Sequence, residues 1–204
     1  MVSSAQPHVT RFGCSVAMYN NIIAVGAYGI GPAPEYEVFN NGRVYIYIAT
    51  EGVWSNIFDI ESINMGEEFG RSVALYERTL VVGCPGMDLR RGRAFVFEIP
   101  QSTDDYQELT FTSHLKATLY NPSGRREQDD EFGFSVAIYG DTIVVGVPGQ
   151  NVYDNTLTQS KINNTGSICV FVLHNSRWGR TISRLLGQRT SRIHDYKFVS
   201  DTSN

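Results

Sequence analysis

The chain has 204 residues, of which 42% are hydrophobic and 12% aromatic, enough apolar material to build a sizeable buried core. Its 17 basic and 21 acidic residues give a formal net charge of -4, which argues against a nucleic-acid partner held by bulk electrostatic attraction. No apolar run approaches the roughly 20 residues of a membrane span, and residues 1–10 lack the basic and apolar regions of a secretory signal.

One short motif occurs three times. It starts with a Phe-Gly pair, continues with alternating large and small side chains, and ends in a Val-Gly pair. The motif positions are Phe12, Gly13 and Gly26, then Phe69, Gly70 and Gly83, then Phe132, Gly133 and Gly146. Successive copies begin roughly 60 residues apart, and such a period indicates a repeat architecture.

The first part of each copy predicts two strands joined by a tight turn. From Phe12 to Met18 small residues alternate with large ones, so one face of this strand is narrow, as an innermost strand near a crowded centre requires. Asn20-Asn21 tolerate the positive φ of a hairpin turn, and the apolar run 22–25 suits a second strand covered on both faces. The equivalent segments are 69–75, 77–78 and 79–82 in the second copy, and 132–138, 140–141 and 142–145 in the third.

The second part of each copy predicts two further strands after a connection of variable length. The connections span 27–41, 85–91 and 148–165. The third strands span 42–49, 92–98 and 166–173, and the more polar fourth strands, which suit an outer edge, span 53–60, 115–120 and 178–185. Four antiparallel strands in each unit predict an all-β fold, a partial β-propeller of about three four-stranded blades. We expect a single repeat domain, 1–204, with blades at 12–68, 69–131 and 132–186 and a tail or degenerate fourth start at 187–204.

The chain resembles the FG-GAP repeat family, whose units form the propeller of integrin α subunits. The resemblance rests on the three motif copies and on Gly42-Arg43-Val44-Tyr45 and Gly92-Arg93-Ala94-Phe95, and it covers 12–186. Many family members carry an Asp-rich calcium loop between the first two strands. Here short turns replace that loop, so we expect no calcium at those turns and no other cofactor.

Three blades leave two open ends, because propellers close with four to eight blades and the family is generally associated with seven. Residues 195–199 resemble the start of a fourth copy, with Val199 in place of the glycine. The sequence therefore leaves three possibilities: a fragment of a longer propeller, a half that pairs with itself or with another chain, or an open arc capped by its tail.

Residues typical of catalysis are sparse, and we expect no enzyme activity. No nucleophile motif accompanies the four histidines. The acidic residues before the second and third Phe-Gly pairs are expected in solvated turns, although Asp129, Asp130 and Glu131 are the cluster to test if the chain acts on glycans. The three cysteines, Cys14, Cys84 and Cys169, are expected as buried small side chains, with a Cys14 to Cys84 disulfide left open.

The connections between second and third strands carry more apolar, aromatic and arginine residues than a solvated loop requires. The candidate partner-binding residues are Tyr28, Tyr36, Phe39, Met87, Arg90, Arg91 and Tyr153. They could equally cover the blade faces locally. Asn163 lies in a glycosylation sequon that acts only in a secreted chain.

We expect a non-catalytic interaction or adhesion-type module that binds a protein partner or itself, through these loops or through the open blade ends. The alternatives are a structural subunit completed by another chain and a propeller enzyme acting on glycans. The resemblance implies an extracellular or cell-surface location, although the residues themselves leave the compartment unknown.

Overall fold

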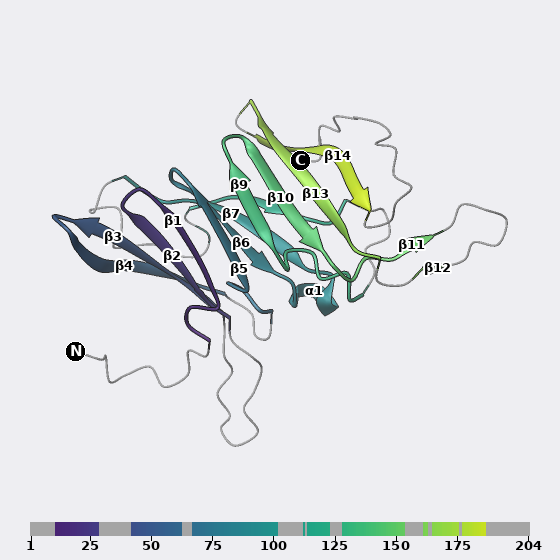
Figure 1. Cartoon of the computed structure of the whole chain (residues 1–204), viewed down its shortest axis with the longest axis horizontal. Helices are drawn as coiled ribbons and strands as arrows, with labels where there is room; N and C mark the ends of the chain where they lie inside the picture. The colour runs from purple at the N-terminus through teal and green to yellow at the C-terminus, as the bar shows by residue number, and fades with distance from the viewer. Residues whose placement is uncertain are drawn as a thin grey trace, which may run out of the picture.

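The computed structural model (Figure 1) describes residues 11–28, 42–62, 67–101, 112, 114–122, 128–153, 161–162, 165–175 and 177–186. These residues form three four-stranded antiparallel sheets, which we call blade 1, blade 2 and blade 3. Blade 1 contains β1 (Ser15–Tyr19), β2 (Ile22–Ala27), β3 (Arg43–Thr50) and β4 (Val53–Glu61). Blade 2 contains β5 (Ser72–Tyr76), β6 (Thr79–Cys84), β7 (Arg93–Glu98) and β8 (Leu115–Leu119). Blade 3 contains β9 (Val136–Tyr139), β10 (Thr142–Val147), β13 (Ser167–His174) and β14 (Arg177–Leu186).

Two short elements lie in the connections between second and third strands. A four-residue turn, α1 (Met87–Arg90), joins β6 to β7, and the hairpin of β11 (Val152–Tyr153) and β12 (Lys161–Ile162) lies between β10 and β13. Within each blade the strands follow one another in chain order from one edge of the sheet to the other. This topology confirms the predicted all-β partial propeller.

The Phe-Gly pairs lie in turns before the first strands, rather than in the strands as the sequence suggested. Gly13, Gly70 and Gly133 have φ values of 85°, 86° and 93°, which break the extended conformation. Each of these glycines donates its amide N–H to the carbonyl of the glycine that is next to last in the second strand, with N–O distances of 3.0 to 3.1 Å. The turn is therefore closed against its own blade.

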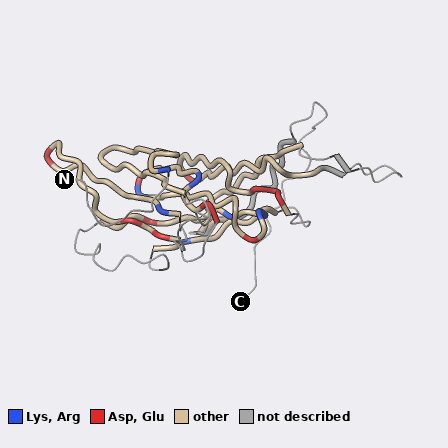
Figure 2. Tube along the Cα trace, turned by 90° about the horizontal axis from the view of Figure 1, so that it is seen from below, with Lys and Arg blue, Asp and Glu red and all other residues tan. Residues whose placement is uncertain are grey.

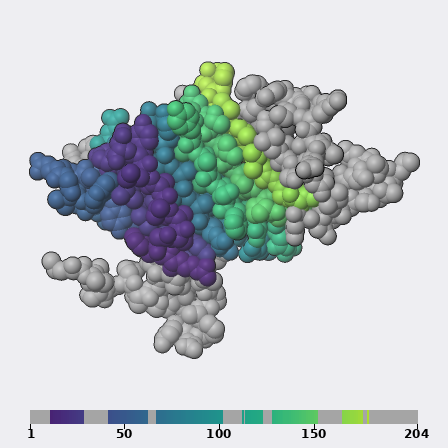
Figure 3. Space-filling model, viewed as in Figure 1, coloured from purple at the N-terminus to yellow at the C-terminus, as the bar shows by residue number. Residues whose placement is uncertain are grey.

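The three blades pack face to face, in chain order (Figure 3). Their first strands β1, β5 and β9 lie side by side (Figure 1), as expected for the strands nearest a common axis. One apolar cluster joins blades 1 and 2, and it includes Ile46 and Phe97. A second cluster joins blades 2 and 3, and it includes Val96 and Phe171. Blade 2 is therefore covered on both faces.

The same contact joins blade 1 to blade 2 and blade 2 to blade 3, and we call it the inter-blade joint. In the first joint the Ser15 hydroxyl donates to the Gly70 carbonyl at 2.9 Å, and a Cβ built on Gly26 would lie 2.1 Å from that oxygen. A Cβ on Gly42 would likewise lie 2.0 Å from the Phe69 carbonyl oxygen. Only glycine permits this approach.

The second joint repeats the first with the equivalent residues. The Ser72 hydroxyl donates to the Gly133 carbonyl at 2.8 Å, and a Cβ on Gly83 would lie 2.0 Å from that oxygen. Gly92 contacts the Phe132 backbone in the same way. The serine on the narrow face of the first strand, the glycine near the end of the second strand and the glycine before the third strand therefore form a socket for the next Phe-Gly turn.

Strand β10 differs from the sequence-based expectation of a second strand covered on both faces. Its residues alternate between buried and half-buried, whereas β6 is buried from Leu80 to Cys84. The difference arises because β6 lies between two blades, whereas the described residues cover β10 on the blade 2 side.

Candidate functional site

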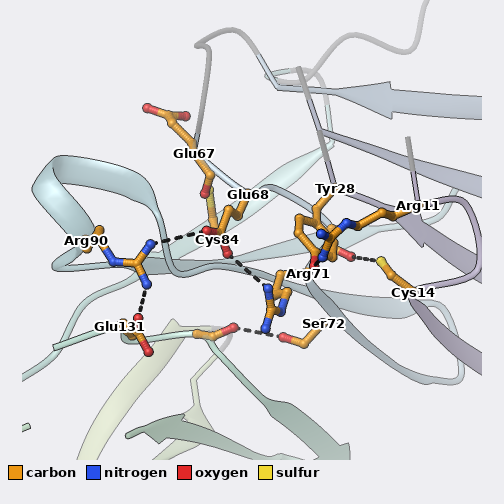
Figure 4. Close-up of polar contacts among 12 residues, drawn as sticks. Arg11, Cys14, Tyr28, Glu67, Glu68, Arg71, Ser72, Cys84, Arg90 and Glu131 are labelled. Carbon is orange, nitrogen blue, oxygen red and sulfur yellow. Dashed lines mark hydrogen bonds and ion pairs between the residues drawn. The ribbon is translucent and has the colours of Figure 1, made fainter. Parts of the chain in front are cut away.

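Of the candidate residues, Tyr28 and Arg90 lie where the connections between second and third strands meet the Phe-Gly turns, and we call this edge of the three blades the rim (Figure 4). Tyr28 follows β2, and Met87, Arg90 and Arg91 belong to the connection around α1. Tyr153 ends β11, and nothing is described of its side chain. Tyr36, Phe39 and Asn163 lie outside the described residues.

Acidic and basic residues are both spread along the described chain (Figure 2). The arginines of the rim are held by specific neighbours. Arg90 lies among Glu68, Asp129 and Glu131, and Arg71 lies between two aromatic rings.

Tyr28 is buried, and two arginines cover it. The guanidinium carbons of Arg11 and Arg71 lie 4.9 and 4.7 Å from the centre of its ring, and Arg11 also donates to its hydroxyl. Arg71 in turn lies 4.6 Å from the centre of the Phe134 ring. This row of side chains joins blade 1, blade 2 and blade 3, so Tyr28 has a local structural role at the rim.

Sequence reasoning did not select Arg71 and Phe134. The available signal was their register, because Cys14, Arg71 and Phe134 all directly follow a Phe-Gly pair. Equivalent positions in stacked repeats lie side by side. An arginine at this position in the second copy and an aromatic residue in the third therefore predict that Arg71 stacks on Phe134.

The turn α1 holds three consecutive residues in the left-handed conformation. Asp88, Leu89 and Arg90 have φ values of 56°, 58° and 62°. This conformation costs about 1–2 kcal/mol for each residue with a side chain. Hydrogen bonds within the turn offset part of that cost, among them Gly92 N to the Met87 carbonyl at 2.9 Å. The turn presents the Leu89 side chain to solvent with 66% of its surface exposed.

Arg90 fixes this turn through three carboxylates. Its guanidinium lies 3.4 Å from a Glu68 oxygen and 3.3 Å from an Asp129 oxygen, and it forms an ion pair with Glu131. The hydrogen bond to Glu131 raises the pKa of Arg90, so this side chain stays positively charged. The cluster therefore anchors the turn of blade 2 to the residues that lead into blade 3.

Asp130 corrects the expectation that residues 129–131 form a solvated turn. Its side chain is buried and accepts a hydrogen bond from the Asn121 amide at 3.0 Å, while its backbone carbonyl accepts one from Gly149 N at 3.1 Å. The neighbouring carboxylates of Asp129 and Glu131 contact Arg90 instead. Asp130 therefore contacts the segment after β8, whereas Asp129 and Glu131 contact the turn α1.

The cysteines are all thiols, and none forms a disulfide. Cys84 and Cys169 are buried as expected, but Cys14 is exposed because it lies in the turn before β1. Burial raises the pKa of the Cys84 thiol well above its usual value, and this thiol donates to the Glu67 carbonyl at 3.0 Å. Cys84 therefore behaves as a protonated core residue.

The described residues contain no group of three or more His, Cys, Asp or Glu side chains that could hold a metal ion. In the same part of the chain, helices of sufficient length and hydrophobicity to cross a bilayer are absent.

Comparison with known families agrees with the repeated joint. The family model described as FG-GAP repeat matches residues 9–47, 63–97 and 126–171, which together make up more than half of the chain. Each matched region contains one Phe-Gly turn, the first two strands of a blade and most of the third. A comparison with curated proteins found no match. The chain therefore belongs to the FG-GAP repeat family.

Proposed function

We propose that this chain is a non-catalytic interaction module of the adhesion type, and that it binds a protein partner at the rim. Its repeats are those of a β-propeller-type module, for which adhesion or interaction is a common role, and the family is generally non-enzymatic. The observation that carries the proposal is the turn α1, where a left-handed backbone and a three-carboxylate anchor present an exposed leucine.

Leu89 gains little within the chain from this arrangement. A turn of ordinary stability would avoid three left-handed residues, and strain of this kind is found at binding sites more often than elsewhere. The Arg90 anchor keeps the leucine in place, which lowers the entropy lost when a partner binds. Arg91, paired with Asp88 at 3.4 Å, adds a partly exposed guanidinium beside it. An apolar tip with an adjacent arginine is suited to a shallow apolar recess with an acidic edge on a partner.

The alternative of an enzyme acting on glycans receives no support from its three candidate carboxylates. An acid and base pair needs two carboxyl groups that face one substrate. Asp130 is buried against Asn121, and the carboxylates on either side of it are engaged by Arg90.

The test compares partner binding by the wild type with binding by a variant in which only Leu89 is substituted. The immobilised chain captures proteins from an extract of its source cells, and the affinity of each captured protein is measured for the wild type, Leu89→Asp and Val53→Asp. Val53 is a matched control, because it is 65% exposed on the outer hairpin of blade 1. We expect Leu89→Asp to weaken binding at least tenfold, or about 1.4 kcal/mol, and Val53→Asp to leave it unchanged. Equal affinity of all three chains for every captured protein would contradict the rim as the binding site.

A further inference from the structure

The socket that occurs at both inter-blade joints is present a third time on blade 3. Ser135 corresponds to Ser15 and Ser72, and Gly146 corresponds to Gly26 and Gly83. The backbone of blade 3 is arranged in the same way, because Gly133 N donates to the Gly146 carbonyl at 3.1 Å. Blade 3 is therefore shaped to accept a further Phe-Gly turn.

The third socket contacts no such turn among the described residues. A Cβ on Gly146 would have only Ser135 atoms as its nearest neighbours, and a Cβ on Gly166 would meet nothing closer than the Pro148 carbonyl oxygen at 3.4 Å. In both internal joints a carbonyl oxygen of the next blade lies 2.0 or 2.1 Å from the equivalent position. Ala137 is exposed here, whereas its counterpart Ala74 is buried against blade 3.

The opposite end of the chain carries a Phe-Gly turn without a socket among the described residues. Phe12 is 55% exposed, whereas Phe69 and Phe132 are fully buried. Met18 is 67% exposed, and Val16 on the same face is similarly exposed, although their counterparts in β5 are buried. Exposed apolar side chains gathered on one sheet face indicate an interaction surface.

A row of tyrosines ends in the same way. Tyr19, Tyr76 and Tyr139 occupy equivalent positions at the ends of the first strands, and successive ring centres lie 5.2 Å apart. Tyr139 is the last ring and is highly exposed. A further first strand on this face would bring another ring into the row.

We propose that a second copy of this chain places its Phe12-Gly13 turn in the socket of Ser135, Gly146 and Gly166. The argument is continuity: this chain carries both halves of a joint that it already makes twice within itself. Two copies related by a two-fold axis then form two identical joints and close a ring of six blades, within the range in which propellers close. In this ring Tyr19 of each copy follows Tyr139 of the other. The assembly uses the outer faces of blades 1 and 3 together with the Phe12-Gly13 turn, and it does not involve Leu89, so its test is independent of the test of the proposed function.

The experiment measures the mass of the full chain by light scattering and sedimentation at low micromolar concentration. We expect the wild type to have twice the mass of the 22.8 kDa chain. Ala137→Arg blocks the socket, and Met18→Arg disrupts the opposite face. Both positions are exposed within one chain, so both variants are expected to fold and to have the mass of a single chain. Circular dichroism and thermal melting verify folding.

Two controls define the joint. Val53→Arg and Leu89→Arg place the same charge at equally exposed apolar positions outside both faces, and both are expected to keep the double mass. An equimolar mixture of Ala137→Arg and Met18→Arg is expected to associate again, because one joint of the mixed pair has no substitution.

Three results would overturn the proposal. A wild-type chain with the mass of a single copy would show that no such joint forms. Loss of association in only one of the two face variants would indicate pairing of like faces. A mass that grows with concentration beyond two copies would exclude the closed ring. None of these results bears on partner binding at Leu89, because the test of the proposed function changes Leu89 alone.

Discussion

At Gly26 and Gly83 the spacing between two blades depends on the absence of a side chain. A Cβ at either position would lie within 2.1 Å of a carbonyl oxygen in the next blade, which is far inside the contact distance. The serines at the same joints turn this approach into a hydrogen bond, so the carbonyl of Gly70 or Gly133 is satisfied. The missing Cβ of the glycines and the hydroxyl of the serines therefore explain why the first strand has a narrow face in every copy.

The buried second strand provides a test at the residue scale. Val82 lies on β6 with no exposed surface, so Val82→Asp places a carboxylate in the cluster between blades 1 and 2 without a partner of opposite charge. We expect a loss of at least ~4 kcal/mol in the free energy of unfolding, measured by urea denaturation. Val53→Asp, at an exposed position, is expected to change it by less than about 0.5 kcal/mol. Similar midpoints for the two variants would mean that β6 is not enclosed.

Strands and hairpins were the elements that the sequence predicted best. Period-two patterns and turn residues are local signals, and Asn20, Glu77 and Gly140 adopt the positive φ expected of these turns. The left-handed turn α1 carries no comparable signal, because Asp88 and Leu89 are not glycines and their conformation depends on the Arg90 contacts. Those contacts come from residues that are distant in sequence.

The burial of Asp130 likewise depends on a residue outside its own turn, so the local sequence did not predict it. A run of two aspartates and a glutamate is typical of a solvated turn, and the burial of the middle one depends on Asn121 in the segment after β8. The candidate site was therefore predicted in part. The connection that contains Arg90 was identified, whereas the exposed tip at Leu89 and the stacking of Arg71 required the arrangement of the three blades.

The connection between blades 2 and 3 provides a test at the element scale. Asp130→Ala removes the acceptor of the Asn121 amide in a buried site, and we expect it to cost about 2 kcal/mol of stability. Asp129→Ala removes a carboxylate that is 63% exposed and 3.3 Å from Arg90, and we expect a cost below about 1 kcal/mol. Thermal melting of both variants at pH 7 shows which substitution lowers the stability more. A larger effect of Asp129→Ala would show that the Arg90 cluster, and not Asp130, holds this connection.

The whole molecule is a stack in which the middle blade differs from its neighbours. Blade 2 has an apolar cluster on each face, whereas blades 1 and 3 each have one described cluster and one face with exposed or half-exposed apolar residues. The repeat predicted this order of blades. The sequence left open what covers the outer faces, because one Phe-Gly turn and one socket can be joined within or between chains.

Hydrogen exchange of the second strands tests the central claim, that three blades stack face to face around the repeated joint. Strands β6 and β10 are both paired on both edges, so hydrogen bonding alone gives them equal protection. In the Ala137→Arg variant, which keeps the outer face of blade 3 open, we predict that β6 amides exchange more slowly than β10 amides by a factor of ten or more, about 1.4 kcal/mol. Equal exchange of the two strands in that variant would contradict the stacked arrangement.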